Sequence, residues 1–311
     1  MPEESKLKAP WLVAVWPGMG HVAISAGYYL MAKLGMHAHA EFSPRELFDL
    51  ESVEVKEGLI KGARLPRSRF FVWQDPRHQR DLVVFIGEAQ PPLGRYAFCH
   101  RLIDYARRLG VEKVFTFAAM GTPMRPENSP RVFVAATDQQ TLAEMREQEV
   151  EVLAEGQISG LNGALLGVAA EMGLAGGCLL GEMPHVFAQL PFPAASLGVL
   201  RVFGKLAKIE IDLAELAQQA EAMGHRLGEV LVEIERRIAE QGEAAEAEES
   251  FEPPAEEPRV SPADERRIDE LFEKARADRS KAYELKGELD RLEVFDLYED
   301  RFLDLFKKEA S

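Results

Sequence analysis

The chain has 311 residues, 46% of them hydrophobic, and carries a formal net charge of −15. This size and apolar content are sufficient for a substantial core, but the acidic balance argues against nucleic acid as a partner, because a phosphate backbone rewards clustered Lys and Arg. We expect a cytoplasmic protein that does not enter a membrane, since no apolar run reaches the roughly 18 residues of a spanning helix and the N-terminus lacks the apolar core of a signal peptide.

Strand and helix patterns alternate through the first 240 residues. Residues 11–16 form a continuous apolar run that ends at Pro17, as in a strand covered on both faces. The further elements predicted in chain order are a helix at 23–34, strands at 37–42, 69–73 and 81–87, a helix at 96–109, strands at 113–119 and 131–137, a helix at 138–148, a helix ending near 172 and a strand at 176–181. This alternation predicts an α/β fold, with a mostly parallel or mixed sheet and helices on both faces.

A different organisation is predicted beyond this region. One long helix is expected at 213–240, and its apolar stripe needs a partner to cover it. Residues 241–263 are acidic and contain several prolines, which predicts a linker. Helical patterns return at 264–287 and 289–308. We therefore expect a domain at 1–240, a linker at 241–263 and a helical C-terminal segment at 264–311.

The aromatic stretch at 294–302 leaves two interpretations open. Its Phe, Leu and Tyr side chains are interleaved with carboxylates, so it forms an amphipathic segment. Such a segment can lie in a groove of a partner protein. Docking onto the core of its own chain would bury the same apolar groups equally well.

The two cysteines, Cys99 and Cys178, lie in apolar surroundings and form no Cys-x-x-Cys pair. Buried, reduced thiols are the favoured interpretation. Reduced thiols agree with a cytoplasmic location.

A glycine turn, Gly18–His21, follows the first strand. The ends of strands in α/β sheets commonly meet ligands. However, the turn lacks the third glycine of a dinucleotide fingerprint, because position 23 is alanine. A tight structural turn is favoured over a nucleotide site.

A second glycine segment, Ser159–Gly163, leads into an apolar run of helical length. Asn162 is expected to cap that helix, with hydrogen bonding to a ligand as the alternative. No Gly-Lys-Thr or Gly-Lys-Ser sequence follows, which excludes a P-loop.

Glu182 and His185, together with His21, are the best candidates for an acid/base pair or a metal cluster. The spacing of a His-Glu-x-x-His zinc site is absent. We therefore favour polar loop residues satisfied by the backbone. No catalytic residue, metal or cofactor is predicted.

Four segments follow one another in a definite order. They are Gly18–Gly20, Ser159–Gly163, the Gly-Glu-Met-Pro-His sequence at 181–185, and Pro193–Ala195 ahead of a helix. This order resembles the PAC2 family, which is named after proteasome assembly chaperones. The resemblance covers roughly residues 9–240. It implies a fold similar to nucleoside phosphorylases, which characterised relatives use for protein assembly.

Two functions follow as hypotheses. The leading one is a non-catalytic, homo-oligomeric protein of the assembly-chaperone type that binds an unidentified client protein. The competing one is an enzyme of nucleoside-phosphorylase type that acts on a small molecule, with phosphate against the glycine turns. The candidate contacts to a ligand or partner are Gly18, Gly20, His21, Gly160, Asn162, Gly163, Glu182 and His185.

The C-terminal sequence indicates whether a proteasome is expected as the client protein. Some archaeal relatives end in a hydrophobic residue, a tyrosine and one last residue, which inserts between subunits of a proteasome ring. Here the comparable trio, 297–299, is internal and has no free carboxylate. The sequence therefore predicts no docking to a proteasome by that route.

Overall fold

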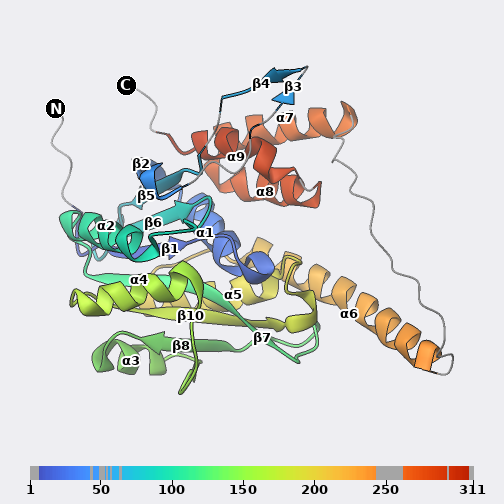
Figure 1. The fold of residues 1–311 in the computed structure, drawn as a ribbon, viewed down its shortest axis with the longest axis horizontal. Helices are drawn as coiled ribbons and strands as arrows, with labels where there is room; N and C mark the ends of the chain where they lie inside the picture. The colour runs from blue at the N-terminus through green and yellow to red at the C-terminus, as the bar shows by residue number, and fades with distance from the viewer. Residues whose placement is uncertain are drawn as a thin grey trace.

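The computed structural model describes residues 7–42, 45–48, 53, 55–56, 58–62, 65–242, 262–292 and 294–307. Ten strands lie in this part of the chain. They are β1 (Trp11–Val15), β2 (His37–Phe42), β3 (Val55–Lys56), β4 (Leu59–Ile60), β5 (Ser68–Trp73), β6 (Leu82–Gly87), β7 (Lys113–Thr122), β8 (Val132–Ala136), β9 (Glu151–Val152) and β10 (Ala175–Pro184). β3 and β4 form a separate hairpin, and the others form one sheet (Figure 1).

The eight-stranded sheet is mixed, as the sequence predicts. Its order is β2-β5-β6-β1-β7-β10-β8-β9. The four central strands β6, β1, β7 and β10 are parallel. β5 is antiparallel to both of its neighbours, and β8 is antiparallel to β10. Because the central strands are parallel, their carboxyl ends meet at one edge of the sheet.

Helices cover both faces of the sheet. The described helices are α1 (Val22–Lys33), α2 (Arg95–Arg108), α3 (Gln139–Arg146), α4 (Gly160–Glu171), α5 (Pro193–Ala207), α6 (Ala214–Gly242), α7 (Pro262–Ala277), α8 (Ala282–Arg291) and α9 (Phe295–Asp304). One face is covered by α1 and α5, and the other by α2 and α4 (Figure 1). None of the described helices combines the length and apolar composition that crossing a bilayer requires.

Every residue of β1 is apolar because both faces of this strand are covered. Successive side chains of a strand point to opposite faces of a sheet. Trp11 and Val13 therefore join the core beneath α1 and α5, whereas Leu12 and Ala14 join the core beneath α2 and α4. Since both faces are covered, no position of β1 can be polar.

The long helix α6 is covered along only part of its length. Leu216 and Leu227 are buried in the core that includes α5. Val230 and Ile234, one and two turns further on, are exposed. Figure 1 shows this half of α6 extending away from the sheet. Among the residues that the structure describes, the predicted apolar stripe is therefore covered at one end of α6 only.

The helical pattern at 264–287 is interrupted at Asp278. The backbone of Asp278 is extended, and its side chain accepts a hydrogen bond from the backbone N–H of Ser280. This local bond ends α7 and starts the short turn η4 (Arg279–Lys281) before α8. The second helical pattern, at 289–308, begins in the last turn of α8 and continues in α9. Residues 243–261, most of the predicted linker, lie outside the described residues.

The C-terminal helices dock on the chain's own core. Phe302 and Phe306 are buried in the same cluster as Tyr28 of α1 and Phe71 of β5. The structure thereby favours one of the two interpretations that the sequence left open for residues 294–302.

Candidate functional site

The turn after β1 is bound to the loop after β10. Gly20 and His21 both have left-handed backbone conformations, with φ of 61° and 52°. The backbone N–H of Gly20 donates to the Ala188 carbonyl over 2.8 Å, and the N–H of Phe192 donates to the Gly20 carbonyl over 3.0 Å. These bonds hold the ends of β1 and β10 together.

Gly20 is required for close packing. A Cβ atom at this position would overlap the thioether of Met183, which is fully buried. A left-handed conformation also suits glycine better than other residues. The space beside the turn is therefore filled by a side chain, in agreement with the prediction of a structural turn.

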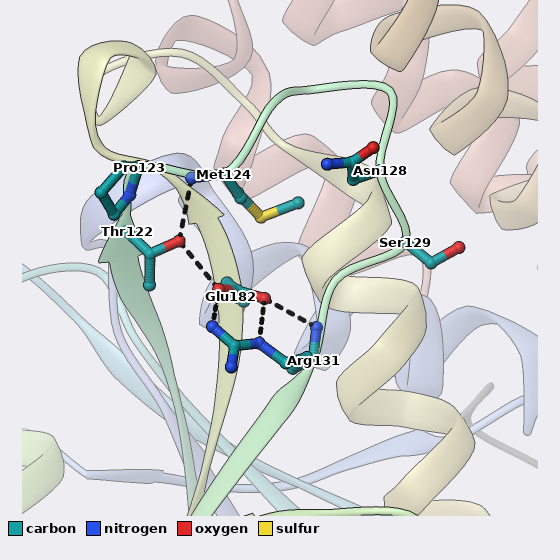
Figure 2. Close-up of a pocket in the computed structure, with 7 residues that line it drawn as sticks. All are labelled: Thr122, Pro123, Met124, Asn128, Ser129, Arg131 and Glu182. Carbon is teal, nitrogen blue, oxygen red and sulfur yellow. Dashed lines mark hydrogen bonds and ion pairs between the residues drawn. The ribbon is translucent and has the colours of Figure 1, made fainter.

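Glu182 lies on β10 and is bound to Arg131, the residue before β8 (Figure 2). Arg131 Nη2 donates to Glu182 Oε1 over 2.5 Å and Arg131 Nε donates to Oε2 over 2.9 Å. The backbone N–H of Arg131 also donates to Oε2 over 3.1 Å, and the Thr122 hydroxyl donates to Oε1 over 2.8 Å. Four donors thus surround a carboxylate that is 3% exposed.

This environment fixes Glu182 as an anion. The hydrogen bonds from Arg131 lower the pKa of Glu182 to about 2, and this effect outweighs the burial that would raise it. Hydrogen bonds to Glu182 and Glu151 raise the pKa of Arg131. A carboxylate has about four acceptor positions, and four donors already use them. The geometry does not suit Glu182 to assist a reaction as a general acid or base near neutral pH.

The interpretation of Glu182 as a loop residue satisfied by the backbone is wrong. β10 continues through Pro184, which pairs with Thr122 of β7. Glu182 is therefore a strand residue, and its main partner is a side chain. Sequence reasoning missed Arg131, although a strand predicted at 131–137 placed an arginine at its start.

His185 lies in the short helix η3 (His185–Phe187), next to the same strand end. Its Nδ1 is 2.8 Å from the Thr122 carbonyl oxygen. Thr122 thus contacts both Glu182 and His185, which the sequence grouped together. His21 is exposed on the turn after β1. Among the residues that the structure describes, no group of three or more His, Cys, Asp or Glu side chains could hold a metal ion.

A pocket opens above the ion pair, with a cavity volume of about 300 Å³ (Figure 2). Its lining residues come from the end of β7, the following loop, the start of β8 and β10. They are Thr122, Pro123, Met124, Asn128, Ser129, Arg131 and Glu182. The charged groups in the pocket bind one another, so the pocket presents no uncompensated charge for a phosphate.

The second glycine segment lies elsewhere. α4 begins at Gly160 and belongs to the face opposite α1. Asn162 is inside the first turn, so its prediction as the cap is wrong. Instead, Gln90 Oε1 accepts a hydrogen bond from the Leu161 N–H over 3.0 Å. A Cβ atom at Gly163 would collide with the Ile158 carbonyl. The structure does not bring this segment to the Gly20 turn, because the sheet lies between them.

Three apolar side chains point outward around the closed strand ends. Met19 is 46% exposed, Val186 56% and Leu190 45%. We call these three residues the strand-end rim. Met19 and His185 both approach the backbone of Gly121, which places the two loops of the rim next to each other. Large exposed apolar groups that gather at one place indicate a surface for binding other molecules.

The sequence and the fold of this chain are similar to those of several known proteins. The sequence is 26% identical over 215 residues to the uncharacterized protein MJ1210 of Methanocaldococcus jannaschii, covering 68% of this chain and 79% of that protein. PbaB of Pyrococcus furiosus, an archaeal proteasome activator, is 26% identical, with a TM-score of 0.61 over 73% of this chain and 96% of PbaB. The Mycobacterium tuberculosis proteasome-assembly chaperone homologue Rv2125 is 22% identical, also with a TM-score of 0.61, over 71% of this chain and 94% of Rv2125.

A comparison with sequence models of protein families identifies the family to which these relatives point. The model of the PAC2 family matches residues 12–231, which span β1 to the middle of α6. This chain therefore belongs to the PAC2 family.

Proposed function

We propose that this protein binds other polypeptides as a non-catalytic protein of the assembly-chaperone type. The similarity to PbaB, a proteasome activator, supports a role in contact with other proteins. The observation that carries the proposal is the structure of the strand ends. Met183 packs against the Gly20 turn and Arg131 binds Glu182, whereas the side chains of the strand-end rim are exposed.

Burial of the rim side chains by a partner protein would stabilise the complex. Burying a fully exposed Met, Val or Leu side chain contributes about 1.5–3 kcal/mol, so each rim side chain, which is about half exposed, gains roughly half of that when a partner covers it. Methionine also adapts its shape to different partners. The rim therefore offers a compact apolar contact that several client surfaces can cover.

The proposal includes self-association in the cytoplasm. Self-association is supported by the half of α6 that extends from the sheet, because Val230 and Ile234 are exposed there and a second copy of the chain could cover them. It also retains the division into a domain at 1–240, a linker at 241–263 and a helical segment at 264–311. The match of the family model to residues 12–231 is consistent with that division.

Affinity capture of the full chain from its native cells, quantified by mass spectrometry, tests the proposal. The double variant Met19→Asp, Leu190→Asp introduces charge at the rim. The matched control is Leu59→Asp, which changes another exposed leucine on the separate β3–β4 hairpin. We expect the rim variant to lose its co-purifying proteins at least tenfold and the control to retain them. Recovery of the same proteins by the rim variant, or of none by the unchanged chain, would contradict the proposal.

A further inference from the structure

A second surface of the core, formed by α1, β2 and β5, is covered by the C-terminal helices. Aromatic rings from both sides meet there. Tyr29 and Tyr283 pack edge to face with ring centroids 4.3 Å apart, and Tyr28 packs in the same way against Phe302 at 5.5 Å. Tyrosine is one of the residues that contribute most to binding between separate proteins.

Complementary charges accompany the aromatic contacts. The hydroxyl of Tyr28 donates to Glu299 Oε1 over 2.7 Å. Arg69 Nη2 donates to Asp300 Oδ1 over 2.6 Å, and Arg67 Nη1 donates to the same oxygen over 3.1 Å. The receiving surface thus supplies the positive groups, and α9 supplies the negative ones. Such pairs give an interface orientation and specificity rather than large net stability.

The same segment also covers an edge of the sheet. β2 is an outer strand, and an outer strand presents N–H and C=O groups that a further chain can pair with. The N–H of Ala38 donates to the Phe306 carbonyl over 2.5 Å. The chain just after α9 therefore uses an edge contact of the kind found when a peptide adds to a sheet.

The covering segment is attached to the core through residues 243–261. These 19 residues follow α6 and precede α7. The segment also lies beyond residues 12–231, which match the family model. A tether of this length can span up to roughly 65 Å when extended. Because the segment belongs to the same chain as its site, it binds there intramolecularly, and a free helix must compete with it.

We propose that the surface of α1, β2 and β5 is a docking site for an acidic, aromatic helix of a partner protein, and that α7–α9 is a tethered occupant which such a helix displaces. The chemistry of the partner follows from α9 and its next turn. Three phenylalanines form its apolar side: Phe302 and Phe306 follow Phe295 by seven and eleven residues. Glu299 and Asp300 lie between them. A partner helix presents the same arrangement. This site is separate from the strand-end rim, so it does not depend on the proposed function.

A labelled synthetic peptide of residues 282–307 tests the proposal by fluorescence anisotropy with the full-length protein. Asp300→Arg in the protein removes both pairs to Arg67 and Arg69, which weakens the tethered segment without altering the receiving surface. Asp304→Arg makes the same charge change on the same helix, at a residue whose ion pair is with Lys307. We expect the Asp300→Arg protein to bind the peptide at least tenfold more tightly than the unchanged protein and the Asp304→Arg control.

Glu299→Gln provides a milder second variant, which removes a charge but keeps the size of the side chain. Hydrogen exchange at residues 294–307 reports release of the segment in both variants. The proposal predicts faster exchange there and tighter peptide binding together. Equal peptide affinities for the variants and the unchanged protein, or unchanged exchange in both variants, would overturn it.

Discussion

Arg131 and Glu182 form a two-pronged ion pair across the antiparallel strands β8 and β10. Two guanidinium nitrogens reach the two carboxylate oxygens, and the backbone N–H of Arg131 adds a third bond. Thr122 joins this pair to the end of β7. The pair therefore fixes three strand ends at the edge of the sheet where ligands commonly bind in α/β proteins. Its role is to hold these strand ends in place relative to one another.

Glu182→Gln is predicted to lower the free energy of unfolding by about 2 kcal/mol, because it replaces a buried carboxylate that accepts four hydrogen bonds. Arg131 is half exposed and keeps its pair with Glu151. Urea denaturation at neutral pH measures the change. Glu151→Gln is the matched control, since Glu151 pairs with the same arginine but is half exposed. A loss below about 1 kcal/mol is expected for that pair. Equal losses for the two variants would show that burial of the pair does not matter.

The stability of the protein is predicted to fall in acid. The pKa of Glu182 is about 2 in the folded chain, against an ordinary value of 4.5. The unfolded chain therefore takes up a proton at a higher pH than the folded chain does. The stabilisation is present above about pH 4.5 and is lost as the pH falls toward about 2. Between about pH 5 and about pH 3, the unchanged protein should lose about 2 kcal/mol more than Glu182→Gln. Identical pH profiles would refute this.

The sequence predicted the central architecture because its signals are local. A strand covered on both faces, such as β1, needs an apolar residue at every position, and its sequence shows this directly. α3 lies within the helix predicted at 138–148, and the Asp138 side chain caps it by accepting a hydrogen bond from the Thr141 N–H. Information of this kind lies within a few residues of each element.

The side-chain partners in the candidate site could not be predicted, because they come from segments that are far apart in the sequence. Glu182 resembles a loop residue because it is charged, and only the antiparallel pairing of β8 with β10 brings Arg131 beside it. The capping of α4 depends on Gln90, which precedes it by about seventy residues in the chain. The place of Asn162 inside α4 follows from that distant cap. Tertiary pairing therefore decided these side chains, and local pattern did not.

Gly20→Ala is predicted to destabilise the fold by about 2 kcal/mol or more. The added methyl group meets the Met183 thioether, and alanine is strained at a φ of 61°. Thermal and urea unfolding measure the loss. Gly18→Ala is the control, because its backbone is extended and a Cβ atom there has open space around it. A tolerated Gly20→Ala change would mean that the turn does not serve close packing.

Both cysteines are predicted to resist thiol reagents in the folded protein. Burial raises the pKa of Cys99 and of Cys178 to about 12, and neither side chain is exposed. The thiolate is the reactive form. Titration with a coloured disulfide reagent at mildly alkaline pH should detect no rapid reaction until denaturant is added. Rapid labelling of either thiol without denaturant would be inconsistent with the described core.

The central claim is that the strand-end rim binds other polypeptides. The most direct measurement is photo-crosslinking in native cells from a benzoylphenylalanine placed at Val186, in the middle of the strand-end rim. The account predicts discrete protein adducts that disappear when Met19→Asp and Leu190→Asp are introduced together. Absence of protein adducts, or adducts that persist in the double variant, would contradict it.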